Sequence, residues 1–211
     1  MSDPATGPVT LRPLEREDVD LLDRWRAGDA VAGEALFKRY FDAIYGFFET
    51  KCSADADELT QSTFLACVCA RDRFRKESTF RTYLFTIARH ELYRMLRTRY
   101  RRDAKLDFEH SSIAEIITTP GTRLARDQEH ARLIEVLQDL PVETQTLLEL
   151  HYREELELEE LAEIFEVTNQ VIRTRLSRAR KQLREKLEKL AKVEADVLAT
   201  REDWAGRIAR S

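Results

Sequence analysis

The polar residues between positions 168 and 181 have the side chains and the helical spacing that hydrogen bonding to bases requires. Arg can donate two hydrogen bonds to O6 and N7 of guanine, and Asn or Gln can pair in the same way with adenine. Ile172, Leu176 and Ala179 recur at three- and four-residue intervals, which places them on one face of a helix. The opposite stripe presents Asn169, Gln170, Arg173, Thr174, Ser177 and Arg178. The residues expected to contact double-stranded DNA are these six with Thr168, Arg175, Arg180 and Lys181.

A second cluster, from Phe74 to Leu84, alternates basic and aromatic residues. Basic side chains can follow a phosphate backbone while aromatic rings stack on exposed bases, a combination suited to single-stranded or opening DNA. The aromatic residues could equally belong to the core, and the sequence leaves both interpretations open. On the helix expected to follow, one stripe carries His90, Arg94, Arg97 and Arg101.

The charge distribution supports a nucleic-acid partner although the formal net charge is −4. Between residues 71 and 102 there are 11 basic residues and 3 acidic ones, and between residues 173 and 192 there are 9 and 2. Two separate basic blocks in an otherwise acidic chain are typical of surfaces that bind phosphate.

The elements that position these residues are expected to be helices. With 6 Gly and 5 Pro in 211 residues, the chain has few of the turn residues that hairpins and barrels require. Helical periodicity becomes clear after Asp29, a candidate N-cap. A short helix ending at Phe165, a three-residue turn and a long basic helix predict a helix-turn-helix; the alternative is an ordinary helical hairpin with a solvated charged face.

We therefore predict an all-α protein with two small helical domains joined by a flexible linker. The predicted leader, residues 1–27, includes a possible short helix over residues 14–25. Within the linker, Ile113, Ile116 and Ile117 could form a short docking segment. The remaining predicted boundaries are 28–102 for the first domain, 103–129 for the linker, 130–190 for the second domain and 191–211 for a tail.

Several classes of function find no support in the sequence. Cys67 and Cys69 lack a second pair of ligands at zinc-binding spacing, and two residues apart on a helix they point in different directions. No combination of residues suggests a catalytic triad or an acid–base pair. No apolar run reaches the length of a signal peptide or a membrane span. We expect a cytoplasmic protein that is not an enzyme, binds no metal or cofactor and does not insert into a membrane.

Two stretches together resemble the conserved regions of the extracytoplasmic-function (ECF) sigma factors of the sigma-70 family. The first comprises DADELTQSTFL (55–65), FRTYLFTIARH (80–90) and MLR (95–97). The second comprises LP (140–141), LEELA (158–162) and RLSRAR (175–180). Their order, their separation by a linker and the chain length all fit that family.

The resemblance implies promoter recognition at two places, without a catalytic role or a cofactor. The DNA-contacting residues of the second region would read the −35 element, and the linker would thread toward the polymerase active-site cleft. The implied partners are promoter DNA, core RNA polymerase through its β′ clamp helices and β flap, and an anti-sigma factor. The residues implied at the −10 element are Arg75, Lys76, Ser78, Thr79, Phe80, Arg81, Tyr83, Arg89, His90, Arg94 and Arg97. The residues implied at the polymerase are Asp57, Glu58, Gln61, Thr63, Phe64 and Leu65.

Some positions depart from the family pattern. Tyr83 stands where many members have Trp, and Glu155, Glu166 and Gln170 stand where Gly is usual. A non-glycine residue in a left-handed turn costs roughly 1–2 kcal/mol, so we expect the turn at Glu166 to differ in shape. These departures affect the expected promoter sequence more than the resemblance itself.

Two other functions remain possible from the sequence. A helix-turn-helix regulator that dimerises on palindromic DNA would account for the second half of the chain and should bind duplex DNA without polymerase. A helical adaptor with no nucleic-acid role would bind its partner without the steep salt dependence that phosphate contacts produce.

Overall fold

The computed structural model describes residues 13–74, 76, 78–99, 107–116 and 128–208. These residues form α-helices and two short 3-10 helices and include no β-strand, which confirms the all-α prediction. The chain divides into two compact units, residues 1–95 with 163–166, and residues 96–162 with 167–211. We refer to residues 13–99, up to the end of the helix that crosses this boundary, as the N-terminal module, and to residues 107–116, 128–162 and 167–208 as the C-terminal module.

The N-terminal module packs its helices around an aromatic and aliphatic core. The apolar faces of α2 and α4 supply much of this core, and Phe47, Phe48 and Phe85 are almost completely buried. Asp29 caps α2, accepting hydrogen bonds from the amides of Val31 at 3.0 Å and Ala32 at 3.2 Å, which confirms the predicted N-cap. The helices are α1 (Pro13–Arg26), α2 (Ala30–Cys52), α3 (Ala56–Ala70) and α4 (Phe80–Arg99), with 3-10 helices η1 (Ser53–Asp55) and η2 (Arg71–Arg73).

Helix α1 covers most of the described part of the predicted leader and is packed against α2. Trp25 is only 7% exposed and its ring lies edge-on to Phe37, with centroids 5.2 Å apart. A Cβ atom at Gly33 would lie 2.6 Å from the Trp25 ring, so this close approach of the indole requires glycine. Gly28, with φ +102°, makes the turn between the two helices.

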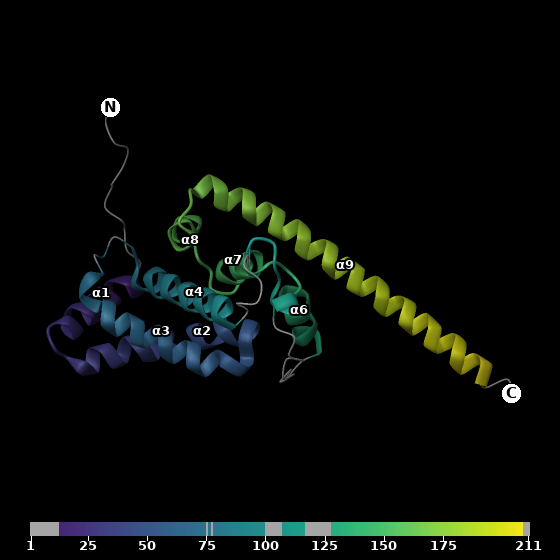
Figure 1. Cartoon of the computed structure of the whole chain (residues 1–211), viewed down its shortest axis with the longest axis horizontal. Helices are drawn as coiled ribbons and strands as arrows, with labels where there is room; N and C mark the ends of the chain where they lie inside the picture. The colour runs from purple at the N-terminus through teal and green to yellow at the C-terminus, as the bar shows by residue number, and fades with distance from the viewer. Residues whose placement is uncertain (1–12, 75, 77, 100–106, 117–127, 209–211) are drawn as a thin grey trace, which may run out of the picture. The chain divides into compact units, whose positions relative to one another are not determined.

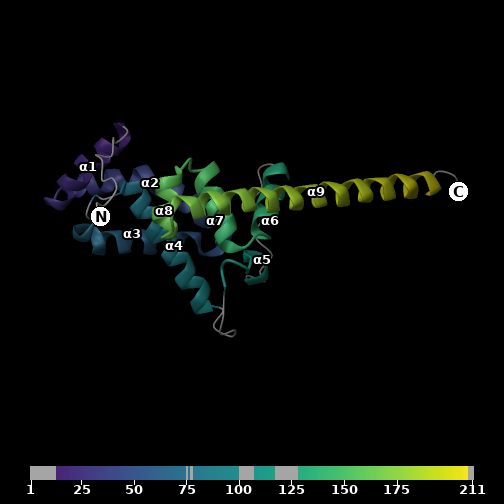
Figure 2. The same ribbon diagram turned by 90° about the horizontal axis from the view of Figure 1, so that it is seen from above.

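The C-terminal module contains α5 (Ile113–Ile116), α6 (Gln128–Gln138), α7 (Val142–Tyr152), the first part of α8 (Leu158–Phe165) and α9 (Asn169–Ile208). A small core of Leu140, Leu148 and Ala179 joins α7 to α9, with Leu137 and Leu183 packed against it. Helix α9 continues as a long, nearly straight rod past α6 and α7 (Figure 1, Figure 2).

Part of the predicted linker is folded. Residues 107–116 contain α5, and Ser112 forms an isolated antiparallel bridge with Pro141. Phe108, Ile113 and Ile116 are buried. Two of the three isoleucines expected to dock therefore do so; the third, Ile117, lies outside the described residues.

Candidate nucleic-acid interface

The turn between α8 and α9 closes in the manner of a helix-turn-helix. Glu166 adopts a left-handed conformation with φ +57°, at a cost of roughly 1–2 kcal/mol for a residue with a Cβ. The amide of Val167 donates to the carbonyl of Ala162 at 3.0 Å and satisfies the last turn of α8. Thr168 Oγ1 accepts from the amide of Val171 at 3.4 Å, which caps α9. Glu166 thus keeps the backbone conformation that glycine would favour.

The two faces of α9 differ sharply. Ile172, Leu176 and Ala179 are buried, as their spacing predicts. Most of the polar residues predicted to contact duplex DNA are exposed on the other side, which gives this face guanidinium, amide, hydroxyl and ammonium groups. The exposed members are Thr168, Gln170, Arg173, Thr174, Ser177, Arg178, Arg180 and Lys181.

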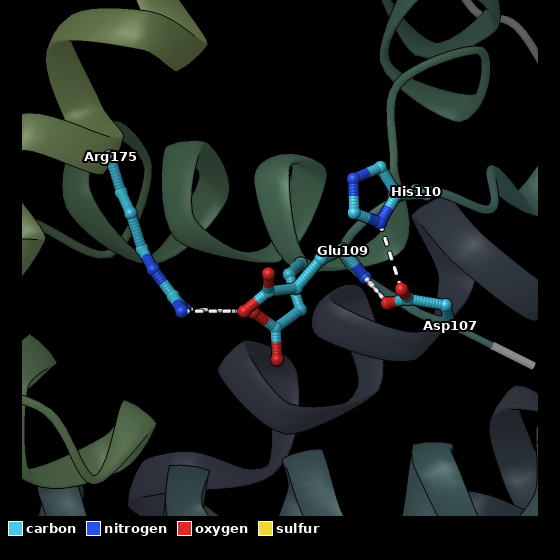
Figure 3. Close-up of polar contacts among 5 residues, drawn as sticks. Asp107, Glu109, His110 and Arg175 are labelled. Carbon is cyan, nitrogen blue, oxygen red and sulfur yellow. Dashed lines mark hydrogen bonds and ion pairs between the residues drawn. The ribbon is translucent and has the colours of Figure 1, made fainter.

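Asn169 and Arg175 lie on the flanks of α9 and contact other parts of the chain. Asn169 Nδ2 donates to Glu159 Oε1 at 2.9 Å, which ties α9 to α8. The Arg175 guanidinium donates to Glu143 Oε2 at 2.8 Å and to Glu109 Oε1 at 2.6 Å. Figure 3 shows the Arg175 side chain directed toward Glu109. These two side chains are held by the protein, whereas their neighbours on the exposed face point to solvent.

The loop between α3 and α4 is tied to α1. The Arg26 guanidinium donates to the carbonyl of Arg71 at 2.7 Å and to that of Phe74. Lys76, at φ +59°, forms an ion pair with Asp23 at 2.5 Å. The predicted site residue Arg75, which lies between these anchors, is outside the described residues. The loop predicted to face the −10 element therefore has two anchors on α1.

The aromatic residues of this region form a small stack. The Phe74 and Tyr83 rings are stacked with centroids 4.6 Å apart, and Phe80 meets Phe74 edge-on at 6.3 Å. Phe74 and Phe80 are buried, while Tyr83 is partly exposed. Thr79 Oγ1 accepts from the amide of Thr82 at 3.0 Å and so caps α4. Ser78 and Thr79 are partly exposed.

Helix α4 carries both buried and exposed basic residues. Arg89 is buried with its guanidinium 4.7 Å from the centroid of the Tyr93 ring, and Arg81 lies partly buried over Phe85 at 5.9 Å. The residues of the basic stripe that are exposed are His90, Arg94 and Arg97; Arg101 lies outside the described residues.

Helix α3 presents a mixed acidic and apolar stripe. Asp57, Glu58 and Gln61 are exposed, and Leu65 is 62% exposed, which is unusual for a large apolar residue. Thr63 and Phe64, from the same set of predicted polymerase contacts, are buried. Thr63 Oγ1 donates to a backbone carbonyl of its own helix at 2.8 Å, and the Phe64 ring packs against α2.

The described residues contain no group of three or more His, Cys, Asp or Glu side chains that could hold a metal ion. Burial raises the pKa of the Cys67 thiol to about 12, which keeps it protonated at neutral pH. None of the described helices combines the length and hydrophobicity that crossing a bilayer requires.

The residues with structural roles near these surfaces that were not predicted include Asp23, Arg26 and Glu109. Arg26 and Glu109 meet partners 45 and 66 residues away in sequence, and Asp23 meets Lys76 across 53 residues. No periodicity marks such contacts. For Glu109, the one available signal was charge complementarity, because this acidic residue of the linker precedes a basic helix.

Comparison with known proteins places both modules in one family. Residues 36–102 match Sigma-70 region 2, and residues 130–183 match Sigma-70 region 4. The chain is 33% identical over 163 residues to RNA polymerase sigma factor YlaC of Bacillus subtilis, covering 74% of this chain and 92% of that protein. It is 25% identical over 182 residues to the ECF RNA polymerase sigma-E factor of Haemophilus influenzae, covering 82% and 96%. The chain belongs to the ECF group of sigma-70 factors.

A solved structure shares the fold of this sigma factor. The sigma factor RpoE of Bartonella quintana, crystallised with the anti-sigma factor NepR, superposes with a TM-score of 0.58 at 24% identity, covering 74% of this chain and 96% of that one. These matches confirm the predicted family. Its members are DNA-binding subunits that act in transcription initiation. Helix α1 and residues 107–116 lie outside both matched regions.

Proposed function

We propose that this sigma factor directs core RNA polymerase to promoters by reading the −35 element as duplex and capturing the −10 element as its strands separate. It supplies recognition, while nucleotide addition belongs to the polymerase. The observation that carries the proposal is the exposed face of α9, which concentrates cations and amides opposite a buried apolar stripe.

Helix α9 is proposed to enter the major groove at the −35 element. Arg173 and Arg178 are exposed and unobstructed by the core stripe, so either can reach guanine O6 and N7, and Gln170 can pair with adenine. Arg180 and Lys181 are suited to neighbouring phosphates, which position a protein on DNA without reading its sequence.

The N-terminal module is proposed to engage the −10 element. The loop from Lys76 to Thr79 would hold a base that has left the stack, at a cost of a few kcal/mol that contacts in the loop must offset. The exposed side chains of His90, Arg94 and Arg97 would follow the strand backbone. Phe80 and Arg89 are buried, so we assign them to support of the loop and helix rather than to direct contact.

The exposed stripe on α3 is proposed as the contact for the polymerase β′ clamp helices. Asp57, Glu58 and Gln61 can form polar contacts around Leu65, whose exposed side chain would be buried in the complex. Thr63 and Phe64 would act from inside by holding α3 against α2. The β flap would engage the C-terminal module. An anti-sigma factor, as in the Bartonella complex, is the proposed inhibitor, and the place of action is the cytoplasm.

The proposal is tested by adding the purified full-length chain to core RNA polymerase with a library of genomic promoters. New transcripts should appear that core polymerase alone does not make. The Arg173→Ala and Arg178→Ala variants should each initiate about tenfold more weakly, since one bidentate base contact contributes about 1–3 kcal/mol of discrimination. Lys189→Ala, a substitution on the same helix beyond the matched region, is the control. Failure of the wild-type chain to produce any new transcript would contradict the proposal.

A further inference from the structure

The segment from Asp107 to Ile116 is built into the C-terminal module, although it precedes the residues that match Sigma-70 region 4. Phe108 is 5% exposed, Ile113 3% and Ile116 5%. Ser112 and Glu115 cap α5 reciprocally: the Ser112 amide donates to Glu115 Oε2 at 3.0 Å, and Ser112 Oγ accepts from the Glu115 amide at 3.2 Å. Ten residues of the predicted linker thus have a defined conformation.

This segment completes the start of α7. The N-cap of α7 is Pro141, which forms no side-chain cap hydrogen bond. The first amides of a helix need partners from outside the helix. The Val142 amide donates to the Ser111 carbonyl at 2.9 Å, and the Glu143 amide donates to the Phe108 carbonyl at 3.0 Å. The backbone carbonyls of this segment therefore accept the hydrogen bonds that a Ser or Asp side chain accepts at the start of other helices.

The same segment places a carboxylate on the DNA-reading helix. Asp107 accepts hydrogen bonds from the Glu109 amide at 3.0 Å and pairs with the His110 ring at 2.8 Å, which sets the backbone on either side of Glu109 (Figure 3). Glu109 then meets Arg175 at 2.6 Å, while Glu143 of α7 meets the other arm of the guanidinium at 2.8 Å. The Arg175 side chain is 29% exposed.

A guanidinium held by two carboxylates is poorly suited to bind DNA. The planar fork that would bind a phosphate or guanine is already directed at Glu109 and Glu143. One cation and two anions also leave a local negative charge, which repels phosphate. Arg173 and Arg178, two and three residues away, are exposed instead. Arg175 thus differs from the other arginines of α9 in what it contacts.

We propose that residues 107–116, here called the clip, are a structural part of the −35-reading module, and that Arg175 is a positioning residue. Glu109 and Glu143 hold its guanidinium, and these two ion pairs fix the orientation of α9 on α7. The inference rests on the proposed reading of the −35 element by α9 and narrows the set of residues that do it.

The first test uses the full-length chain with Glu109→Gln, and with Glu188→Gln as a control that makes the same charge change at an exposed position of α9. Glu109→Gln should reduce hydrogen-exchange protection of the Val142 and Glu143 amides. It should also lower −35-dependent initiation by core polymerase about two- to fivefold, the size expected for a half-exposed ion pair. Glu188→Gln should change neither. If Glu109→Gln left either the hydrogen-exchange protection or the initiation unchanged, the proposed role of the clip would be wrong.

The second test separates a positioning residue from a DNA contact by salt dependence. Loss of one phosphate contact lowers the slope of log affinity against log salt by about 0.9. Arg175→Met should weaken promoter binding of the holoenzyme without changing this slope, and adding Glu109→Gln should have little further effect. A drop of about 0.9 for Arg175→Met, or tighter binding by Glu109→Gln alone, would make Arg175 a phosphate contact and overturn the proposal. Hydrogen exchange needs no DNA, so failure of the proposed function is distinguishable from failure of the clip.

Discussion

The two modules each use a segment outside the family-matched residues to hold an element proposed to face DNA, but they do so with different interactions. In the N-terminal module, α1 buries Trp25 and Leu22 and adds polar ties from Arg26 and Asp23 to the loop before α4. In the C-terminal module, residues 107–116 contribute backbone carbonyls to α7 and one carboxylate to Arg175. Both attachments bury apolar side chains, and in the second these are Phe108, Ile113 and Ile116. The contact with the DNA-reading helix in the second attachment is the exposed ion pair of Glu109 with Arg175.

This difference indicates how much each attachment contributes to stability. An aromatic residue buried in a core contributes several kcal/mol, whereas a half-exposed ion pair contributes at most about 1 kcal/mol. Loss of the buried Trp25 ring should therefore unfold structure, while loss of the Glu109–Arg175 ion pair should change the geometry of a folded module.

The largest expected effect is that of Trp25→Ala. Loss of a buried aromatic side chain should lower the free energy of unfolding of the N-terminal module by about 3–5 kcal/mol. Native-state hydrogen exchange of α2 amides measures this module by itself. The control is Val31→Ala on α2, at a position that is 69% exposed, which should change stability by less than about 0.5 kcal/mol. Equal effects of the two substitutions would mean that α1 is only loosely attached, and the contrast between the modules would be lost.

The next effect is that of Arg26→Met on promoter melting. Hydrogen bonds to charged groups contribute about 1.5–3 kcal/mol, so loss of the two carbonyl contacts should reduce open-complex formation about tenfold. Permanganate reactivity of −10 thymines in the holoenzyme complex measures melting directly. Binding to a −35 duplex should be unchanged, because Arg26 acts only on the loop of the N-terminal module.

Arg24→Met is the matched control for Arg26→Met, since it makes the same substitution two residues earlier on α1. Arg24 is exposed and forms an ion pair with Asp29 at 2.6 Å, while Asp29 caps α2 through its other carboxylate oxygen. The Arg24→Met variant should leave promoter melting nearly unchanged. If both variants lost melting equally, the cause would be α1 itself rather than the contacts of Arg26.

How far the sequence predicted these features depends on whether a contact is local. The buried stripe of α9 follows from the spacing of Ile172, Leu176 and Ala179, and the cap of α2 follows from Asp29, because both depend on neighbours within a few residues. The burial of Thr63 and Phe64 was not anticipated, since the resemblance identified their helix but not its orientation. The ties of Arg26 and Glu109 were missed because they join residues 45 and 66 positions apart.

The smallest expected effect concerns two left-handed residues in turns between helices. Gly28, between α1 and α2, has φ +102°, whereas Glu166, between α8 and α9, has φ +57°. Relief of the left-handed strain, reduced by the greater freedom of glycine in the unfolded chain, should make Glu166→Gly stabilising by about 1 kcal/mol or less. Gly28→Ala should destabilise by roughly 1–2 kcal/mol, and only through the backbone, because no atom lies within 4 Å of the added Cβ.

Thermal unfolding of the two variants beside Glu188→Gly decides whether these signs hold. Glu188 lies within α9, where glycine should destabilise the helix by about 1 kcal/mol. The same replacement of Glu by Gly is therefore expected to have opposite signs at positions 166 and 188. A destabilising Glu166→Gly would show that the Glu166 side chain makes contacts worth more than the backbone strain, and the turn before α9 would then depend on that side chain.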